Sequence, residues 1–327
     1  MSDTSITSAR KMNTSVRLLY EGLLKRGISV EAVALPAGST LLLFEYKGRQ
    51  RAIKGVSPDL SSGTGRVIAD NKYASSLVAR KVGASIPETV LYESDSRAEA
   101  FLLSNTPIVV KPLDAAHGNG ITVGVETLSD LKAAIRRAEQ FSEQVLLQAM
   151  VSGVDLRLLV VKDKVVAATE RVPASVVGDG EHAIYELIER ENENPLRGEY
   201  YEKPLNRIDA TKARQYLGDE RWRNEIPVED QIVQVVGTAN IGSGGKSINR
   251  TGQLPEAILN EAVRIAMAAG LYVCGVDFLY DAAKATWFFI EINASPSFGL
   301  HIWPTEGRPE DVVAIYLDAV LENLPSY

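Results

Sequence analysis

The sequence is poor in the residues that form disulfides and zinc sites. Its 327 residues include one cysteine, Cys274, and three histidines whose positions do not match the spacing of a zinc motif. An internal disulfide and a multi-cysteine zinc site are therefore excluded, and Cys274, which lies in an apolar run, is predicted to be a small core residue. No run of about 18 apolar residues occurs either, so we expect no membrane-spanning helix.

The charge distribution lacks any long basic block. With 35 Lys and Arg against 42 Asp and Glu, the formal net charge is −7, which argues against a nucleic-acid partner. The first residues, MSDTSITSARKM, lack the apolar segment of a secretory signal, so we expect a cytoplasmic protein. Apolar residues at 45% and charged residues at 24% are ordinary for a globular protein with a sizeable core.

The most informative stretch is YVCGVDFLYDAAKATWFFIEINASPSFGLH, residues 272–301. Two apolar, β-rich runs, Tyr272–Tyr280 and Thr286–Asn293, flank a turn-forming stretch, and this pattern predicts an antiparallel hairpin. Such a hairpin places Asp277 roughly opposite Glu291, and opposed side chains lie about 5 Å apart.

Strict alternation along the second strand predicts one face made of Trp287, Phe289, Glu291 and Asn293. Two close carboxylates in an apolar strand pair repel each other unless a cation lies between them. A hard divalent cation such as Mg²⁺ would take oxygen atoms from Asp277, Glu291 and Asn293, where no sulfur or imidazole competes. The alternative is that this face points to water and that the spacing is accidental; the pattern alone does not decide.

Hydrophobic periodicity predicts the remaining elements. Residues 1–12 are small and polar, and we expect them to be disordered. Hairpins are predicted at 40–57, with a turn at Lys47–Gly48, and at 155–171. Residues 178–230 are polar and are predicted to be an excursion from the core. Helices are predicted over residues 13–27, 69–83, 127–141, 183–191, 254–270 and 310–321.

Two glycine-rich segments invite comparison with phosphate loops. Residues 106–125 are predicted as strand, glycine-rich loop and strand, whereas a Rossmann or Walker loop opens a helix directly, so this loop is either a flap over phosphates or a hairpin turn. The stretch NIGSGGKS, residues 240–247, imitates a Walker loop, but Asn240 stands where the pattern needs glycine. Gly252 and Pro255 also prevent the long helix that must follow, so we discard a P-loop.

Taken together, these residues resemble an ATP-grasp ligase of the glutathione-synthetase-like group. The segments that carry the resemblance are IVVKPLDAAHGNGITV, GVDLRLLVV, ATERVPASVVGDGEHAIYELI, NPLRGE, TANIGSGGKSINRT, CGVDF and EINASPSFGLH. They extend from about Ala69 to the C-terminus and are most similar to the ATP-grasp domains of cyanophycin synthetase and of the fused bacterial glutathione synthetases. Cyanophycin synthetase has further domains on both sides, so we expect a stand-alone ligase here.

The resemblance implies an α/β (α+β) ATP-grasp fold, in which ATP is held between two α+β subdomains. The expected parts are a small N-terminal α/β subdomain at 1–68, a central ATP-grasp subdomain at 69–150 with the glycine-rich flap, and a C-terminal ATP-grasp subdomain at 151–327 with the metal site.

The resemblance also implies roles for individual residues. Lys72 and Lys111 would contact phosphates, Asp155 the ribose hydroxyls, and Arg157 the transferred phosphoryl group, with Lys111 and Arg157 as the catalytic residues. The metal ligands would be Asp277, Glu291 and Asn293. The flap would contribute His117, Gly118, Asn119 and Gly120 to ATP binding. The adenine hinge would contribute Gln148, Ala149, Met150 and Val151.

The implied activity is that of a carboxylate–amine ligase that uses ATP and Mg²⁺, with Mn²⁺ as an alternative cation. It would form an amide or peptide bond through an acyl phosphate and release ADP and phosphate, acting on amino acids or a short peptide. Two alternatives stay open: an ATP-binding protein without catalysis, and a kinase-like enzyme that phosphorylates a carboxylate or hydroxyl. A homodimer is also an option that the sequence does not decide.

The substrate half of the site departs from the family pattern. Relatives commonly carry arginines where Val236, Gly237 and Gly299 stand, and arginines in such places suit substrate carboxylates. The remaining candidate substrate contacts, each of which is equally compatible with a structural role, are Arg171, Asn240, Arg250, Ser297 and His301.

Overall fold

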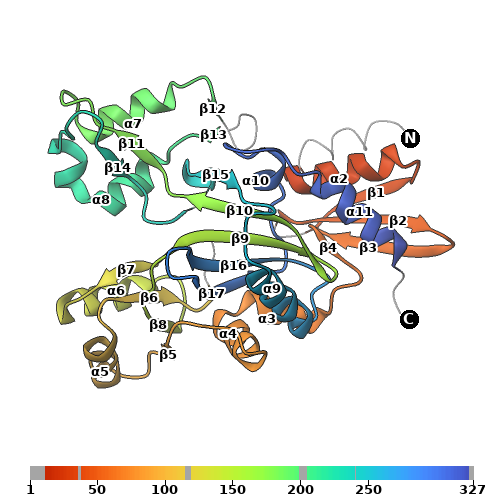
Figure 1. Ribbon diagram of the computed structural model, residues 1–327, viewed down its shortest axis with the longest axis horizontal. Coiled ribbons are helices and arrows are strands. Elements are labelled where there is room, and N and C mark those ends of the chain that lie inside the picture. The colour runs from red at the N-terminus through yellow and green to blue at the C-terminus, as the bar shows by residue number, and fades with distance from the viewer. Residues whose placement is uncertain (1–11, 36–37, 115–118, 199–204, 240, 324–327) are drawn as a thin grey trace.

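The computed structural model describes residues 12–35, 38–114, 119–198, 205–239 and 241–323. Three antiparallel sheets contain most of the described strands, and Figure 1 shows a central sheet between an N-terminal sheet on the right and a third sheet at the lower left. In the described ranges no helix combines the length and the apolar composition that a membrane span requires.

The N-terminal sheet is a four-stranded meander beside helix α2 (Thr14–Lys25), which the Asn13 side chain caps at 3.0 Å from the Val16 N–H. The predicted turn at Lys47–Gly48 is confirmed, since both residues have positive φ angles of 53° and 72°. The strands are β1 (Val30–Ala34), β2 (Thr40–Tyr46), β3 (Arg49–Lys54) and β4 (Ser57–Pro58).

The third sheet has the order β5-β8-β6-β7 and packs against helices α5 (Asp95–Asn105) and α6 (Leu128–Glu139). Its strands are β5 (Thr89–Leu91), β8 (Val145–Ala149), β6 (Ile108–Pro112) and β7 (Thr122–Val125). The predicted strand–loop–strand order of residues 106–125 is confirmed by β6 and β7, although residues 115–118 of the loop lie outside the described chain.

The segment between the first and third sheets holds two helices where the sequence predicted one. Helix α3 (Gly63–Asp70) is followed directly by α4 (Lys72–Lys81), and Asn71 separates them in an extended conformation. The Asn71 side chain accepts the Ala74 N–H at 2.8 Å and so caps α4. This cap fixes the position of Lys72, the first residue of α4.

The central sheet has the order β15-β10-β9-β16-β17. Its strands are β15 (Lys246–Asn249), β10 (Lys164–Val172), β9 (Val154–Val161), β16 (Val273–Asp281) and β17 (Thr286–Asn293). Helix α9 (Glu256–Ala269) covers one face, against which alternate β9 residues such as Leu156, Leu158 and Val160 are buried. Cys274 is buried in the same cluster, as predicted. Strand β15 at 246–249 shows that the NIGSGGKS stretch continues directly into a strand and does not open a helix.

The opposite face of the central sheet is divided along its strands. At one end, Leu159 and Val273 join a core with α2, the N-terminal sheet and helix α11 (Val312–Glu322). This core ties the two ends of the chain together, since Ser15 Oγ accepts the Phe298 N–H at 3.0 Å and the buried Arg51 donates to Val320 O at 3.2 Å. The other end of the face is polar and bears the candidate site.

A smaller module lies at the upper left of Figure 1. Its helices α7 (Ile184–Asn192) and α8 (Ala210–Asn224) enclose an apolar core together with β11 and β14. Only α7 was predicted; α8 is strongly polar and is kinked at Gly218, where φ is 77°. The remaining elements here are β11 (Ser175–Val177), β14 (Ile232–Gln234), β12 (Arg197–Gly198), β13 (Leu205–Asn206) and the 3₁₀ helix η2 (Ile241–Ser243), and α10 (Gly299–Ile302) follows β17.

Candidate active site

The β16–β17 hairpin places the two predicted carboxylates opposite each other. Asp277 is the cross-strand partner of Glu291, which confirms the prediction. The predicted face of the second strand, however, was wrong. A β-bulge follows this pair, so that Phe278 faces Phe289 and Ile290 is the additional residue. Phe289 therefore lies on the α9 face, while Glu291 lies on the other.

Because of the bulge, β17 turns its aromatic side chains towards α9 and its polar side chains towards the opposite face. Trp287 packs, like Phe289, against the α9 core rather than beside the carboxylates. Glu291 and Asn293 are two residues apart beyond the bulge and remain on the polar face. Simple alternation would have placed two large aromatic side chains next to the charges.

The register of the central sheet aligns one polar residue from each strand in a row. The row consists of Asn249, Thr169, Arg157, Asp277 and Glu291, from β15, β10, β9, β16 and β17. The sequence analysis missed Thr169 and Asn249. Thr169 carried a usable signal, because it lies two residues from Arg171 and therefore on the same strand face.

Asp277 is the most strongly bound group of this row. Its carboxylate accepts hydrogen bonds from Arg157 Nε at 2.7 Å, from Arg157 Nη2 at 2.6 Å and from Arg171 Nη2 at 2.8 Å. Burial would raise the pKa of Asp277, but the charges of Arg157 and Arg171 outweigh burial and lower it to about 2. The carboxylate is therefore ionised at neutral pH, although the residue is only 2% exposed.

The two arginines connect Asp277 to two more carboxylates. Arg171 donates to Asp155 Oδ1 from Nε at 2.8 Å and from Nη2 at 2.5 Å, and Arg157 Nη2 lies 3.8 Å from Glu291 Oε1. Burial raises the pKa of Asp155, an effect that Arg171 opposes. Three carboxylates face two guanidinium groups, so the cluster has a formal charge of −1 when all three are ionised.

The donor set of the candidate metal site fits a hard divalent cation. Asp277, Glu291 and Asn293 offer oxygen atoms only, and Asn293 Oδ1 already accepts the Ser295 N–H at 2.8 Å. In the described ranges no group of three or more His, Cys, Asp or Glu side chains is placed to bind a metal ion. A cation here would therefore depend on the amide oxygen of Asn293 and on ligands from outside the chain.

Two lysines approach Glu291 from another part of the fold. Lys111 on β6 is 5% exposed and donates to Gln148 Oε1 at 2.9 Å. Burial lowers the pKa of Lys111 to about 8, and the charge of Glu291 partly offsets this effect. Burial also lowers the pKa of Lys72, again opposed by Glu291. Both predicted phosphate-binding lysines therefore lie within electrostatic reach of a predicted metal ligand.

The candidate adenine hinge has one backbone donor to spare. Gln148 is held at both ends of its amide, by Lys111 and by Thr89 Oγ1, which accepts from Nε2 at 2.8 Å. The Ala149 N–H donates to Glu88 O at 2.8 Å and the Met150 N–H to Pro107 O at 3.1 Å. The Val151 N–H has no hydrogen-bond partner within the described chain and is therefore available to a ligand.

The candidate substrate residues do not all come together. His301 is fully buried, with Nδ1 2.8 Å from Thr169 Oγ1, and burial together with Arg157 and Arg171 lowers its pKa to about 3. Its ring is therefore neutral, and Nε2 has no hydrogen-bond partner in the described chain.

Arg250 lies away from the site. It pairs with Glu170 at 2.6 Å, and Glu170, next to Arg171 on β10, points to the opposite face of the sheet. Ser297 is half-buried in the segment after β17. Of the flap, Asn119 and Gly120 form a turn, and Gly120 has a φ of 73°. His117, Gly118 and Asn240 lie outside the described residues.

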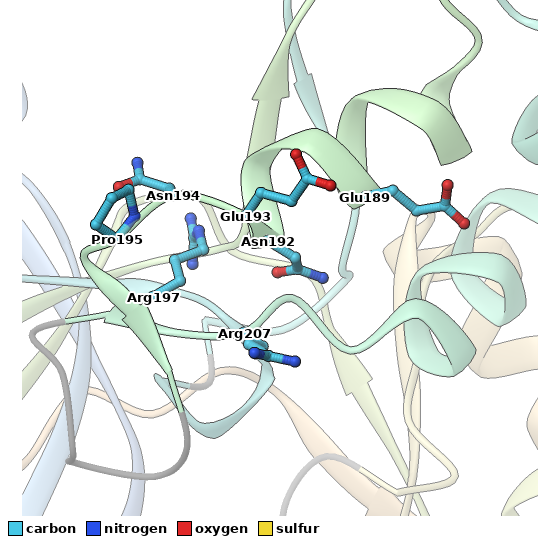
Figure 2. A pocket seen from close by; sticks show the side chains of 7 residues that line it. All are labelled: Glu189, Asn192, Glu193, Asn194, Pro195, Arg197 and Arg207. Atoms are coloured by element: carbon cyan, nitrogen blue, oxygen red, sulfur yellow. The ribbon is translucent and has the colours of Figure 1, made fainter.

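A cavity of about 490 Å³ lies elsewhere, in the α7–α8 module. Figure 2 shows Glu189 and Arg207 pointing to one side of it, with Asn194 and Pro195 on the other side. Arg197 within it has a structural role, since it donates to Glu191, to Asn206 O at 2.6 Å and to Gly244 O at 3.1 Å. Because its polar groups diverge and include none of the predicted site residues, we assign no chemistry to this cavity.

Comparison with known proteins gives the same family at three levels. Residues 75–183 match the family model of the prokaryotic glutathione synthetase ATP-grasp domain. The chain is 31% identical over 292 residues to cyanophycin synthetase of Trichormus variabilis. The aligned region covers 86% of this chain and 32% of that protein. It is 31% identical over 319 residues to the glutathione biosynthesis bifunctional protein GshAB of Pasteurella multocida, which covers 93% of this chain and 42% of that protein.

The same architecture occurs in a solved structure. The crystal structure of a bifunctional glutathione synthetase from Pasteurella multocida superposes with a TM-score of 0.66 at 29% identity, covering 96% of this chain and 44% of that one. This chain thus spans about a third to two-fifths of the length of the curated relatives it matches. It belongs to the ATP-grasp family, in its glutathione-synthetase-like group.

Proposed function

We propose that this chain is an ATP- and Mg²⁺-dependent ligase that joins a carboxylate to an amine and releases ADP and phosphate. The observation that carries the proposal is the approach of Lys72 and Lys111, from α4 and β6, to the Asp277–Glu291 pair of the central sheet. Cationic and anionic side chains in this arrangement suit a phosphate chain with a divalent cation between phosphate and protein. Similarity to a cyanophycin synthetase and to a glutathione biosynthesis protein supports a ligase.

The chain's own groups would hold the nucleotide in three places. The Val151 N–H and the neighbouring hinge carbonyls would read the adenine edge, and Met150, which is 43% exposed, would offer an apolar surface to the base. Asp155 would accept from the ribose hydroxyls. Lys72 and Lys111 would bind phosphate oxygens, as point charges already stripped of much of their water.

Asp277, Glu291 and Asn293 would hold the divalent cation. When bound, Mg²⁺, or Mn²⁺ in its place, supplies positive charge that neutralises phosphate oxygens. Asp277 suits this role because its pKa of about 2 keeps it ionised at any working pH.

The first chemical step is phosphoryl transfer from ATP to the substrate carboxylate. A carboxylate oxygen forms a bond to the γ-phosphorus while the bond to the β–γ bridging oxygen breaks, which yields an acyl phosphate and ADP. Arg157 and Lys111 would stabilise the charge on the phosphoryl oxygens during transfer. The guanidinium group of Arg157 is aligned for this task by its two hydrogen bonds to Asp277.

In the second step the amine attacks the acyl carbon, and phosphate leaves with the electron pair of the C–O bond. The amine loses a proton to the medium, and the product is an amide one water lighter than its two parents. We propose amino acids or a short peptide as the substrates. The candidate substrate contacts are Arg171 and His301, which lie beside this region, and Ser297 in the segment after β17.

The test is ADP and phosphate release measured with the full chain, ATP and Mg²⁺ against pairs of carboxylates and amines, with mass spectrometry of the products. The proposal expects ADP release that needs both partners. ADP release without an amine would indicate a kinase-like enzyme instead. No release with any pair, despite measurable ATP binding, would favour a nucleotide-binding protein without catalysis.

A further inference from the structure

The arginine–carboxylate cluster, formed by Arg157, Arg171, Asp155, Asp277 and Glu291, leaves little capacity for a free cation. Asp277 accepts three hydrogen bonds from the two guanidinium groups. A carboxylate has about four acceptor positions in all, and arginine stays charged at every physiological pH. Most of the binding capacity of this metal-ligand candidate is therefore already used by the protein itself.

The cluster is also shielded from water, which strengthens every charge interaction within it. The side chains of Asp277, Arg157 and Arg171 are 2%, 9% and 15% exposed. A divalent cation that entered alone would meet two fixed positive charges at hydrogen-bond distance from its own ligand. The remaining formal charge of −1 is a weak attraction for an ion with a strongly held hydration shell.

Nucleotide phosphates change this balance. The planar guanidinium group pairs with phosphate oxygens as well as with carboxylate oxygens. Phosphates that bind Arg157 or Arg171 therefore free acceptor positions on Asp277 and add negative charge beside them. Both changes favour entry of the cation.

We propose that Arg157 and Arg171 act as built-in counter-ions of Asp277, so that the divalent cation enters the site only together with nucleotide phosphates. This inference rests on the proposed function, because it takes a nucleotide as the ligand that competes for the guanidinium groups. Towards the cation, Arg171 acts through Asp155 and Asp277, which its side chain bridges, and this effect is separate from any contact of Arg171 with substrate.

His301 gives independent support. Its Nε2 is buried without a hydrogen-bond partner in the described chain, and its Nδ1 bonds Thr169, the cross-strand partner of Arg157. With the proton on Nδ1, Nε2 is an acceptor, and the ring lies within electrostatic reach of both guanidinium groups. An arginine that leaves Asp277 thus has a second acceptor nearby.

The experiment measures Mn²⁺ binding to the nucleotide-free full chain, by electron paramagnetic resonance of the free ion. Arg171→Gln should bind Mn²⁺ at least about tenfold more tightly than the wild type, because one competing positive charge is removed. The matched control is Arg214→Gln, which likewise removes an arginine from an ion pair, here with Asp219 on α8, far from the cluster in sequence. It should bind Mn²⁺ like the wild type.

Two further measurements hold even if Arg171→Gln does not fold. Arg171→Lys keeps the charge and should bind free Mn²⁺ as weakly as the wild type. A non-hydrolysable ATP analogue, corrected for its own Mn²⁺ binding, should tighten Mn²⁺ binding to the wild type by at least about tenfold. Equal Mn²⁺ affinity with and without the analogue would overturn the inference, as would an Arg171→Gln variant that binds no better than Arg214→Gln.

The outcomes separate this inference from the proposed function. Tighter Mn²⁺ binding by Arg171→Gln, without amine-dependent ADP release by the wild type, would support the counter-ions and refute the ligase. Amine-dependent ADP release with unchanged Mn²⁺ affinity in Arg171→Gln would support the ligase and refute the counter-ions.

Discussion

Replacing Lys111 with methionine is expected to stabilise the fold while it removes nucleotide binding. Lys111 is 5% exposed, and the only hydrogen bond of its ammonium group found in the described chain is to the uncharged Gln148. Burial lowers its pKa from 10.5 to about 8. The folded state therefore holds a charge that the unfolded state accommodates more easily, and a cost of this kind is typical of a functional group.

The size of the effect follows from the pKa. Each pKa unit corresponds to about 1.4 kcal/mol, so the charge on Lys111 destabilises the fold by about 3 kcal/mol. Methionine has a similar length and no charge, but it leaves Gln148 Oε1 without its donor, which costs about 1 kcal/mol. A net gain of about 2 kcal/mol remains, or roughly 3 °C in Tm for a chain of 327 residues.

The dependence on pH provides an internal check. Below pH about 8 Lys111 is protonated in both the folded and the unfolded state, so the full destabilisation of the fold is present. Between about pH 8 and 10.5 Lys111 loses its proton in the folded state but keeps it in the unfolded state, and the destabilisation is lost progressively as the pH rises through this window. The advantage of Lys111→Met over the wild type should shrink across this window. Gln148→Glu tests the same reasoning from the other side. A carboxylate beside Lys111 raises the pKa of Lys111 in the folded state, so this variant should not gain stability between about pH 8 and 10.5 as the wild type does.

The assay is thermal and denaturant unfolding at pH 7 and pH 10, combined with calorimetry of ATP binding. A Lys111→Met variant that is less stable than the wild type at pH 7 would refute the reasoning, since it would mean that Lys111 serves the fold. Normal ATP affinity in this variant would refute its assignment to the phosphates.

The remaining predictions concern the metal pair, a helix cap and a close backbone approach. Glu291→Gln removes the charge of a proposed metal ligand at constant shape and should lower turnover at least about 10³-fold with an unchanged circular dichroism spectrum; near-normal ADP release would contradict the site assignment. Asn71→Ala removes the cap of α4 and should lower the free energy of unfolding in urea by about 1 kcal/mol. Because Lys72 is the first residue of that helix, ATP binding should also weaken. Unchanged stability together with unchanged ATP affinity would contradict the role of the cap. Gly153→Ala should destabilise the chain by about 2 kcal/mol or more, since φ is 150° and a Cβ would approach the Tyr280 backbone to 2.7 Å; a wild-type Tm would argue against this close contact.

The elements that local patterns encode were predictable from the sequence. The alternation in Tyr272–Asn293 and the turn-forming residues between its runs predicted the hairpin and the pairing of Asp277 with Glu291, and the structure has both. Lys47–Gly48 likewise predicted a turn that the positive φ angles confirm. In each case a few neighbouring residues carry the signal.

Features that depend on distant segments were not predictable. The contacts of Asp277 with Arg157 and Arg171 join strands 120 and 106 residues apart, and no local pattern specifies them. The bulge at Ile290 interrupts the period-two pattern without a glycine or proline to mark it. Helix α8 lacks an apolar stripe and contains Gly218 in a non-helical conformation, so its sequence resembles a loop. The opposite-face position of Arg250 likewise depends on strand register.

The core that joins both ends of the chain has a consequence for biosynthesis. Ser15 and Arg51 bond Phe298 and Val320, and α2 packs with α11. A ribosome releases the N-terminal sheet long before it has made α11, so during translation this sheet lacks the partner that covers its apolar side. The third sheet, whose core lies wholly within residues 98–147, can be completed much earlier. The N-terminal sheet is therefore made before the third sheet but finished after it, and until α11 is made it presents an exposed apolar surface to the chaperones of the cell.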